Sequence, residues 1–421
     1  MTGIGNAFVQ VGAARDGLDP YLDCARRRDM PAVLVETPAY LSWRRALRRK
    51  PFDAELAVRA PEDPAQVAAA LSAAGVAPAL VLAGFDRYTE SALRLAATAH
   101  VRPWPHVGTS FRAPDKAGQR AALSRHAPTV RQPKYAQVTA DETWSALREL
   151  SFPQVVKPVD GGGGLGVHLV GDEAERDRAL HRIGAAANFG GAAFADVLVE
   201  EQVVGNEYSL QCLAWEGKAH LLSMCEKVVL TEEDGESRGF RECGHMATAG
   251  DNAPLRFREL AQWCAEATGY REGPFHIDLI DTAEGPYFLE MGFRLSGFGL
   301  VSFVEYATGL DWAERVFTAH ADRQEPVAPA CDPPHRTVAQ LVATRPQQLA
   351  IGRAWAACDP RVSVTAAPAT PDLRLFTASD LAALAADRER HATILGTVRM
   401  EDVRTDRLRD RLRYCATGGR R

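Results

Sequence analysis

The chain has 421 residues, 46% of them hydrophobic and 24% charged, which is the composition of a folded globular protein and excludes a disordered one. The formal net charge of −5 excludes the basic surface of a nucleic-acid-binding protein, so we expect no nucleic-acid partner. No apolar run approaches the roughly 20 residues of a membrane helix, so we expect no membrane partner. The sequence has no secretory pattern at its start, and its eight cysteines include no CxxC pair. We therefore expect a cytoplasmic protein with reduced thiols.

Short apolar runs alternate with helical segments over roughly the first hundred residues. Residues 31–36 and 78–84 have the pattern of buried strands, and residues 61–75 and 85–100 have the spacing of helices. This alternation is typical of βαβ units and a parallel sheet. Residues 1–108 are therefore predicted to form a small open α/β domain.

Residues 109–322 are expected to form a larger domain of mixed type. Two helices, at 115–126 and 139–150, precede a strand-rich region. Strands are predicted over QVVKPV (154–159), GVHLV (166–170), DVLVEEQV (196–203), YSLQCLAWEG (208–217), AHLLSMCEKVVL (219–230), FHIDLID (275–281) and PYFLEMGF (286–293), with helices near 172–186, 255–269 and 302–321. Mixed, mostly antiparallel strands with helices on one face predict an α+β architecture.

Residues 323–421 open with a proline-rich segment and have the mixed pattern of a smaller α/β subdomain. Their last charged run, RTDRLRDRLRY (404–414), is polar on most faces and is typical of a solvated terminal helix. The chain contains no internal repeat and no low-complexity tract.

Residues 154–170 read QVVKPVDGGGGLGVHLV, and three interpretations compete for this glycine run. A Walker phosphate loop places its lysine after the last glycine, whereas Lys157 precedes the glycines, so that interpretation fails. A dinucleotide-binding GxGxxG, which residues 161–166 match formally, needs a helix directly after the loop, whereas the residues that follow alternate as a strand. The remaining functional interpretation is a glycine-rich hairpin that closes over a triphosphate; a tight turn with a surface lysine is its structural alternative.

Together with three other segments in the same order, this hairpin resembles the ATP-grasp superfamily. The segments are Asp115-Lys116 with Arg120, the acidic strand VLVEEQVVGNEYSL (197–210) and the pair FHIDLIDTAEGPYFLEMGFRLSG (275–297). The resemblance covers residues 109–322 well and the C-terminal part loosely. It implies the ATP-grasp fold, of class α/β and α+β, with an N-terminal Rossmann-like pre-ATP-grasp domain (1–108), an ATP-grasp domain with a glycine-rich lid (109–322) and a C-terminal α/β subdomain (323–421).

The resemblance implies ATP as the nucleotide and assigns residues to its phosphates. Lys116 and Lys157 are expected to reach the phosphates from two sides. The amides of Gly162, Gly163 and Gly164 are expected to approach them closely, because glycine has no Cβ.

The resemblance also places adenine and ribose along the acidic strand. Glu200 and Glu201 compete for the position that borders the adenine amino group. Backbone atoms of Glu201 to Val203 would contact the edge of the ring, and Glu207 would reach the ribose hydroxyls.

Asp278 and Glu290 are the expected Mg²⁺ ligands, with Mn²⁺ as an alternative ion. They lie on consecutive predicted strands joined by a turn, where hairpin pairing can bring them opposite each other. Carboxylate oxygens suit Mg²⁺, and the apolar neighbours of both acids argue against two solvent-facing side chains. The superfamily usually has an asparagine ligand two residues after this glutamate; here the residue is Gly292, which leaves the number of metal ions open. His276, two residues before Asp278, shares its strand face.

Four further residues are assigned to catalysis or to the substrate by the same resemblance. Arg294 lies where the superfamily uses an arginine beside the transferred phosphate, and Ser296 follows it in a turn near the substrate. Lys227 resembles a basic residue near the γ-phosphate. His245, in RECGHMATAG, falls where carboxylate–amine ligases have Gly-His before a substrate loop. An exposed strand lysine and a buried structural histidine are the alternatives for the last two.

These residues imply a carboxylate–amine ligase that resembles L-amino acid ligases. ATP would phosphorylate a substrate carboxylate, and an amine would attack the acyl phosphate to form an amide or a dipeptide. The closing lid would keep water away from the acyl phosphate. The expected partners are small molecules, a carboxylate and an amine of amino-acid type, selected by loops near 235–252 and 296–304; a homodimer is compatible with the sequence.

Three other functions stay open. CEKVVLTEE (225–233) resembles a segment of biotin-dependent carboxylases, which act through carboxyphosphate, although the chain has no Met-Lys biotinyl site. Gly292 is compatible with a non-catalytic ATP-binding protein. A nicotinamide dehydrogenase, based on the GxGxxG match, ranks last.

Overall fold

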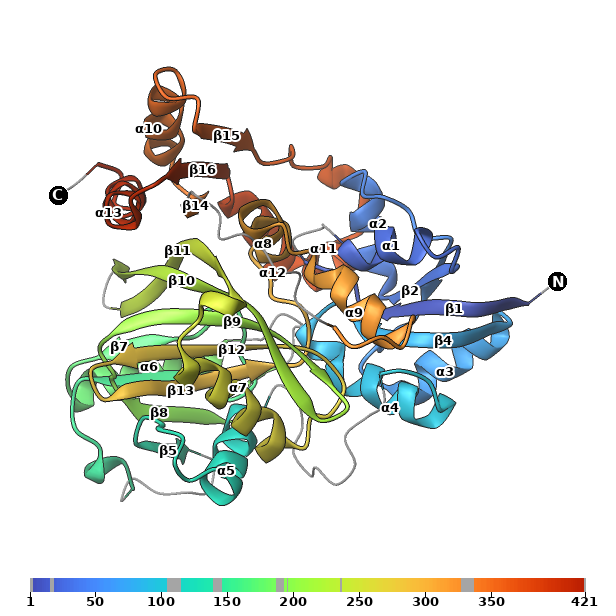
Figure 1. Ribbon diagram of the computed structural model, residues 1–421, viewed down its shortest axis with the longest axis horizontal. Helices are drawn as coiled ribbons and strands as arrows, with labels where there is room; N and C mark the ends of the chain where they lie inside the picture. Colours follow the sequence, from blue (N-terminus) through green and yellow to red (C-terminus); the bar gives the residue numbers. More distant parts are fainter. Residues whose placement is uncertain are drawn as a thin grey trace.

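The structure, a computed structural model, describes residues 3–15, 19–103, 115–138, 146–186, 193–194, 196–234, 237–326 and 337–419. Its N-terminal part, drawn in blue at the right of Figure 1, is a four-stranded sheet with helices packed around it. The strands are β1 (Ile4–Val11), β2 (Ala32–Glu36), β3 (Ala54–Ala57) and β4 (Val76–Ala83). The helical elements are α1 (Pro20–Arg26), α2 (Pro38–Ala46), α3 (Pro64–Ala73), the 3-10 turn η1 (Asp86–Tyr88) and α4 (Thr89–Ala99).

The N-terminal strands pair in the order β3-β2-β1-β4, and these pairs are parallel. β2 is buried along its whole length, as expected of a strand covered on both faces. Helix α3 starts after Asp63, whose side chain accepts a hydrogen bond from the N–H of Ala65 at 2.9 Å. The parallel α/β sheet predicted from the sequence is thereby confirmed.

A second, larger sheet follows, in the green to yellow part of Figure 1. Its main path runs in the order β13-β12-β9-β10-β11-β7-β6-β8-β5, with antiparallel pairing. The strands are β5 (Tyr135–Val138), β6 (Gln154–Pro158), β7 (His168–Val170), β8 (Val197–Glu201), β9 (Asn206–Trp215), β10 (Lys218–Asp234), β11 (Ser237–Ala249), β12 (Gly273–Thr282) and β13 (Gly285–Gly292). The helical elements are α5 (Lys116–His126), η2 (Ala146–Glu149), α6 (Glu173–Ala185), η3 (Gly250–Asn252), α7 (Leu255–Thr268), α8 (Leu300–Thr308) and α9 (Trp312–His320).

Three expectations about this region need correction. The loop expected at 235–252 is mostly the long strand β11, paired along β10; residues 235–236 lie outside the described residues. The helix expected at 302–321 is two helices, because Gly309 adopts a φ of +74° and ends α8. Of the helix expected at 139–150, residues 139–145 lie outside the described residues, and the described end is the 3-10 turn η2.

The C-terminal part, drawn in red, continues the larger sheet and reaches back to the N-terminal part (Figure 1). Its strands are β14 (Thr337–Ala343), β15 (Val362–Ala366) and β16 (Gly396–Asp402), and its helical elements are α10 (Pro346–Ala356), η4 (Leu373–Leu375), α11 (Ala378–Ala383), α12 (Ala385–Thr393) and α13 (Thr405–Ala416). β14 pairs with β11, and Asp387 of α12 lies 3.3 Å from Arg15. The division into 1–108, 109–322 and 323–421 therefore stays a proposal; its first boundary falls outside the described residues.

Helix α13 differs from the solvated helix expected at this end of the chain. Leu408, Leu412 and Cys415 are fully buried, in a cluster that includes residues of β14 and β16. These residues recur at intervals of four and three, which places them on one face of the helix. The charged residues between them hid this apolar stripe in the sequence.

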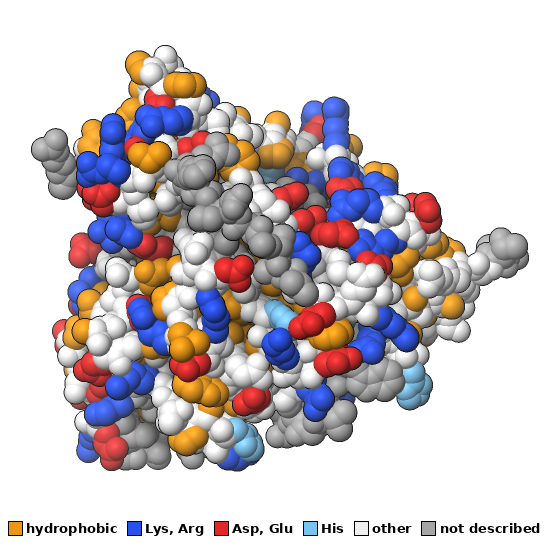
Figure 2. Space-filling view, in the orientation of Figure 1, with side chains coloured by type: hydrophobic (Ala, Val, Ile, Leu, Met, Phe, Trp, Pro, Cys, Tyr) orange, Lys and Arg blue, Asp and Glu red, His pale blue; other side chains and the backbone are white. Residues whose placement is uncertain are grey.

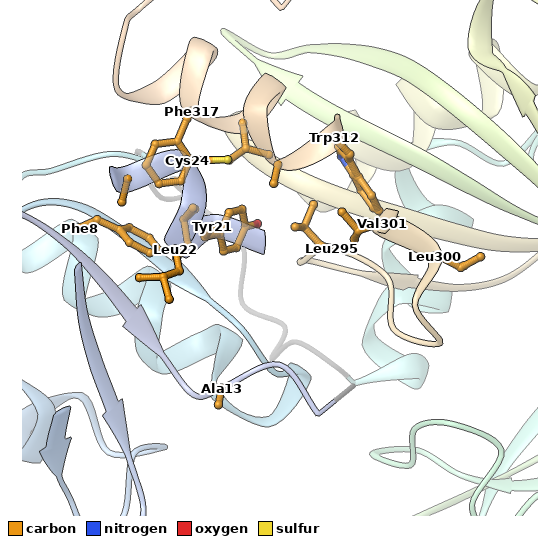
Figure 3. Packing of buried hydrophobic residues seen from close by; sticks show 14 of the residues in the cluster. Phe8, Ala13, Tyr21, Leu22, Cys24, Leu295, Leu300, Val301, Trp312 and Phe317 are labelled. Carbon is orange, nitrogen blue, oxygen red and sulfur yellow. The ribbon is translucent and has the colours of Figure 1, made fainter. Parts of the chain in front are cut away.

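Aromatic packing joins the N-terminal sheet to helices α1 and α9. Phe317 of α9 lies with its ring centroid 5.1 Å from that of Phe8 in β1 and 6.0 Å from that of Tyr21 in α1 (Figure 3). Trp312 of the same helix donates its indole N–H to the carbonyl of Cys212 in β9 at 3.1 Å. Helix α9 therefore holds the small sheet against the large one.

The surface carries charges of both signs. On the face shown in Figure 2, basic and acidic side chains are interspersed. Among the described residues, no helix combines the length and the apolar character that crossing a membrane requires.

Replacing Phe317 with alanine tests this packing. Phe317→Ala should destabilise the protein by about 3–5 kcal/mol, because it empties a fully buried aromatic position. The measurement is the midpoint of urea unfolding followed by tryptophan fluorescence. Leu375→Ala, at a side chain that is 73% exposed, is the control and should change stability little. Equal midpoints for both variants would contradict the role of α9.

Candidate functional site

The glycine run is a turn between two antiparallel strands. β6 and β7 pair from Gln154 opposite Val170 to Val156 opposite His168. Helix α6 begins only after β7, with Asp172 as its N-cap. A dinucleotide fingerprint requires the helix directly after the loop, so the dehydrogenase interpretation of this run is wrong.

Gly163 and Gly164 lie at the exposed tip of this hairpin, and Gly162 is half-buried beside them. The φ values of +61° at Gly163 and +80° at Gly164 lie in the left-handed region, which glycine adopts without strain. A Cβ atom at Gly162 would lie 4.0 Å from Oδ2 of Asp86. The tip therefore lies against η1 of the N-terminal part.

Lys116 joins the hairpin to the acidic strand β13. The lysine starts α5 because Asp115 accepts hydrogen bonds from the N–H groups of the first turn and caps the helix. The side chain of Lys116 is buried, and its Nζ lies 3.0 Å from Oε2 of Glu290. The same ammonium donates to the carbonyl of Gly161, so one charge contacts both elements.

Lys157, Glu200 and Arg120 form a buried cluster of charges, which we call the Glu200 triad. Lys157 Nζ lies 2.8 Å from Oε2 of Glu200, and Arg120 pairs with the other oxygen of the same carboxylate. Burial lowers the pKa of Lys157 below its ordinary value, although Glu200 opposes the shift. Leu198 lies opposite Lys157 in the β6–β8 pairing, so Glu200, two residues further on, shares the face of Lys157.

Glu201 and Val203 follow at the end of β8. The carboxylate of Glu201 accepts a hydrogen bond from the N–H of Ser151 at 2.8 Å. The backbone N–H groups of Glu201 and Gln202 donate to carbonyls just before β5 and β6, each at 2.9 Å. Val203 is half-buried. Of the backbone atoms expected to contact adenine, the N–H groups of Glu201 and Gln202 are therefore already donated within the protein.

Lys227 is the centre of a second, partly buried cluster of charges, which we call the Lys227 cluster. Its Nζ lies 2.7 Å from Glu242, 2.8 Å from Glu207 and 2.9 Å from Asp278. Burial by itself lowers the pKa of Lys227, but the three carboxylates raise it well above its ordinary value. Burial also raises the pKa of Glu207. A contact of Lys227 with phosphate would compete with these three ion pairs.

His245 belongs to the same cluster through Glu242. It lies opposite Lys227 in the β10–β11 pairing, is fully buried, and has its Nε2 2.8 Å from Oε1 of Glu242. Residues three apart on a regular strand face opposite sides, but an extra residue at Cys243 forms a β-bulge that brings both side chains to one face. Burial raises the pKa of Glu242, while Lys227 and His245 lower it to well below its ordinary value.

Asp278 and Glu290 lie directly opposite each other in the β12–β13 pairing. Asp278 Oδ2 pairs with Lys227, whereas Oδ1 is buried and finds no hydrogen-bond donor among the described residues. A buried carboxylate oxygen without a donor suits a cation, so these residues fit Mg²⁺. Burial by itself raises the pKa of Glu290. The charges of Lys116 and Lys157 outweigh burial and lower this pKa to about 2, which keeps the carboxylate ionised.

Another acidic group lies outside the site. Among the described residues, one group of three His, Cys, Asp or Glu side chains has its metal-binding atoms within 4.8 Å of one another, and it consists of Cys24, Asp311 and Glu314. Asp278 and Glu290 therefore have no third donor at this distance among the described residues. Arg27 pairs with both acids of that set. Burial, with Asp311 next, raises the pKa of the Cys24 thiol well above its ordinary value, which disfavours a metal-binding thiolate. This group is therefore an ion-pair cluster.

Arg294 lies beyond β13, and its guanidinium pairs with Asp86 of η1. A cleft with an internal volume of about 50 Å³ adjoins it, and Arg15, Ser296 and Arg390 are among its lining residues. Ser296 is buried, and its hydroxyl finds no hydrogen-bond partner among the described residues. Arginines around a cleft favour an anionic ligand, and here Arg15 pairs with Glu36 and Asp387 while Arg294 pairs with Asp86, so a bound anion would share these arginines with the acids.

Sequence reasoning missed Arg15, Asp86, Glu242 and Arg390. Arg15 and Asp86 follow the carboxyl ends of β1 and β4. Ligands of parallel sheets bind at that edge, so this signal was present in the sequence. The β-bulge at Cys243 changes the strand face of Glu242, so strand periodicity did not predict its position. No sequence pattern near Arg390 indicates that it lines a cleft.

The Glu200 triad predicts that the stability of the protein depends on Glu200 and not on the neighbouring Glu201. Glu200→Gln should destabilise the protein by about 3–5 kcal/mol, because it leaves Arg120 and Lys157 buried with less countercharge. Glu201→Gln is the matched control, since this half-buried acid lies 3.9 Å from Lys134, and a change within about 0.5 kcal/mol is expected. Thermal unfolding by circular dichroism provides the measurement; a larger loss for Glu201→Gln would overturn the assignment.

Part of the chain resembles known proteins in sequence. Residues 150–301 match the family model of the ATP-grasp domain. The chain is 30% identical over 166 residues to the formate-dependent phosphoribosylglycinamide formyltransferase of Marinobacter nauticus, covering 39% of this chain and 40% of that protein. It is 25% identical over 146 residues to dapdiamide A synthase of Enterobacter agglomerans, covering 35% of this chain and 34% of that protein. The matches thus span less than half the length of these relatives.

A solved structure extends the likeness of fold to the whole chain. The L-amino acid ligase from Bacillus licheniformis superposes with a TM-score of 0.65 at 16% identity, over 99% of this chain and 98% of that one. Its likeness covers the four-stranded parallel sheet as well as the large antiparallel sheet. Residues 150–301 therefore match an ATP-grasp domain, and the whole chain shares its fold with this ligase.

Proposed function

We propose that the protein is an ATP- and Mg²⁺-dependent ligase that activates a carboxylate as an acyl phosphate and joins it to an amine, forming an amide or a dipeptide. The observation that carries the proposal is the position of Lys116, which contacts both the glycine hairpin and Glu290. Glu290 in turn lies opposite Asp278. The groups that we assign to phosphate and to the metal ion therefore lie close together.

In this proposal ATP lies between the hairpin and the acidic strands. Lys116 and Lys157 bind its phosphates, and the N–H groups of Gly162, Gly163 and Gly164 approach them from the hairpin tip. Charge neutralisation of this kind, with positioning, accounts for most of the catalysis of phosphoryl transfer.

Adenine would lie at the end of β8. We assign the acid beside its amino group to Glu200 rather than Glu201, because Glu200 shares the face of Lys157. Val203 offers its N–H to the ring edge, and Glu207 reaches the ribose once Lys227 releases it.

Asp278 and Glu290 would hold Mg²⁺, which neutralises charge on the transferred phosphate. Both carboxylates now bind lysines, so metal binding exchanges an ammonium for the cation. His245 is fully buried, the side chain of Lys227 is 6% exposed, and both make their contacts to acids. We therefore assign them positioning roles: Lys227 orients Asp278, and His245 orients Glu242.

The substrate carboxylate would enter the cleft beside Arg294. Arg15 and Arg390 supply further positive charge, and the hydroxyl of Ser296 is available as a donor. A carboxylate oxygen attacks the γ-phosphorus and ADP leaves. The amine nitrogen then attacks the acyl carbon, phosphate leaves, and the nitrogen loses a proton.

The compartment is also a proposal. None of the seven described cysteines forms a disulfide, which supports a reducing environment such as the cytoplasm; Cys331 lies outside the described residues.

The proposal is tested by a phosphate-release screen with ATP, Mg²⁺ and pairs of amino acids, followed by mass spectrometry of the products. We expect phosphate release that needs both a carboxylate and an amine, and a product lighter by one water than their sum. Phosphate release with bicarbonate alone would instead support the carboxylase alternative. ATP binding without turnover for any pair would support a non-catalytic protein.

Arg294→Ala separates catalysis from nucleotide binding. The turnover number should fall about 10²–10³-fold, as is typical when a donor to transition-state charge is removed. The dissociation constant for ATP should change little. Arg256→Ala is the control, since this half-exposed residue pairs with Asp281 at 2.6 Å on the surface. Unchanged turnover in Arg294→Ala would remove the arginine from the mechanism.

A further inference from the structure

The cleft beside Arg294 is lined by three buried side chains that each carry a polar atom without a partner. The hydroxyls of Tyr21 and Ser296 and the Oε1 atom of Gln10 find no hydrogen-bond partner among the described residues. Gln10 is 1% exposed, Tyr21 2% and Ser296 6%. Buried polar groups are almost always hydrogen-bonded, so three open groups around one cleft indicate that a polar ligand binds there.

The amide of Gln10 has a fixed orientation. Its Nε2 atom donates to the carbonyl of Gly12 at 2.9 Å and to Oδ1 of Asp19 at 3.1 Å. Asp19 is ionised because it pairs with Arg44, so both of these oxygens only accept. The nitrogen of the amide is thereby assigned, and Oε1 is left as an acceptor for a ligand that carries an N–H or O–H group.

The hydroxyl of Tyr21 lies on the side of Arg294. In Figure 3 it points from α1 toward Leu295, which lines the cleft. Burial raises the pKa of Tyr21 well above its ordinary value, although the charge of Arg294 opposes the shift. The hydroxyl therefore stays protonated and can donate to an anion that Arg294 binds.

Arg390 of α12 is the lining arginine with an open guanidinium. It forms no ion pair and no hydrogen bond with any residue that the structure describes, and its Cζ lies 5.6 Å from the ring centroid of Phe298. The charge of Arg390 lowers the pKa of Asp387, one turn earlier, against the effect of burial, but Asp387 pairs with Arg15. The fork of Arg390 is therefore available to a carboxylate.

The charges around the cleft balance one another. Three arginines line it, and two of them pair with three acids in total. A neutral set with one open cation and one open acceptor suits a dipolar ligand better than a multiply charged phosphate. The volume of about 50 Å³ holds roughly four water-sized groups, which is about the size of the ammonium, α-carbon and carboxylate of an amino acid.

We propose that Arg390, Tyr21 and Gln10 form the subsite that selects the carboxylate substrate. Arg390 and the hydroxyls of Tyr21 and Ser296 donate to the carboxylate, and Oε1 of Gln10 accepts from an amino group on the neighbouring carbon. This subsite deepens the proposed function and rests on it, because it binds the carboxylate beside Arg294. The C-terminal part of the chain thereby contributes a specificity residue.

The test measures the binding of amino acids to the full-length protein in the presence of Mg²⁺ and the β,γ-methylene analogue of ATP. A thermal-shift screen of the standard L-amino acids finds the tightest ligand, and titration calorimetry gives its Kd. The same acid without its amino group should bind at least about tenfold more weakly, because Gln10 is then left unpaired. Tyr21→Phe and Arg390→Met should each raise the Kd of the amino acid at least about tenfold.

Tyr414→Phe and Arg353→Met are the matched controls. Tyr414 of α13 is 40% exposed, Arg353 of α10 is exposed, and neither lines the cleft, so both variants should leave the Kd unchanged. The hydroxyl of Tyr21 has no partner among the described residues, so its removal in Tyr21→Phe should not lower the midpoint of thermal unfolding. The Kd of the ATP analogue should also stay unchanged in every variant.

The outcomes separate this subsite from the ligase reaction. If no amino acid binds, or if the acid without an amino group binds equally well and both variants keep the original Kd, the inference is overturned. Phosphate release with a carboxylate that has no amino group would then still support the ligase. If an amino acid binds through Tyr21 and Arg390 but no pair of substrates releases phosphate, the subsite stands and the ligase proposal fails.

Discussion

The pairing of Glu200 with Arg120 and Lys157 is the interaction on which the arrangement of β6, β8 and α5 depends. A buried charge is tolerated only with partners, so β8 can hold Glu200 inside only because β6 supplies Lys157 and α5 supplies Arg120. Arg120 also donates to two backbone carbonyls of β13, at 3.1 Å each. Through Arg120, the carboxylate of Glu200 thereby links β6, which leads into the glycine hairpin, to β13, which carries Glu290.

The remaining charged groups obey the same constraint. Lys116 binds Glu290, and Lys227 binds Asp278, so the groups proposed to contact phosphate and metal begin as one another's partners. Binding of a metal–nucleotide complex would replace these pairs. The phosphates would pair with the ammonium groups, and the cation would bind the carboxylates. Buried charge then stays balanced throughout. Under this scheme neither ATP nor the metal ion binds well alone, because each leaves half of the site uncompensated.

Features that depend on residues close in sequence were predictable. The hairpin at 154–170 and the opposition of Asp278 and Glu290 follow from strand alternation and a short turn. Features set by distant residues were not. Arg294 pairs with Asp86 across 208 positions, which no local pattern encodes. Strand β11 was missed because its glycines and polar residues do not alternate, and the bulge within it places Glu242 on the face of His245 against the usual periodicity.

The cleft beside Arg294 draws its walls from four separate stretches of the chain: residues 10–21 near the start, residues 83–85 after β4, residues 294–301 after the acidic strands, and Arg390 in α12. The groups proposed for ATP and metal come from α5 and β6 to β13 alone. Under the proposed function, changes in the first fifteen residues or in the tail would alter which carboxylate fits while leaving the groups assigned to ATP and metal unchanged. The cleft and the ATP-binding groups would then diverge at different rates in evolution.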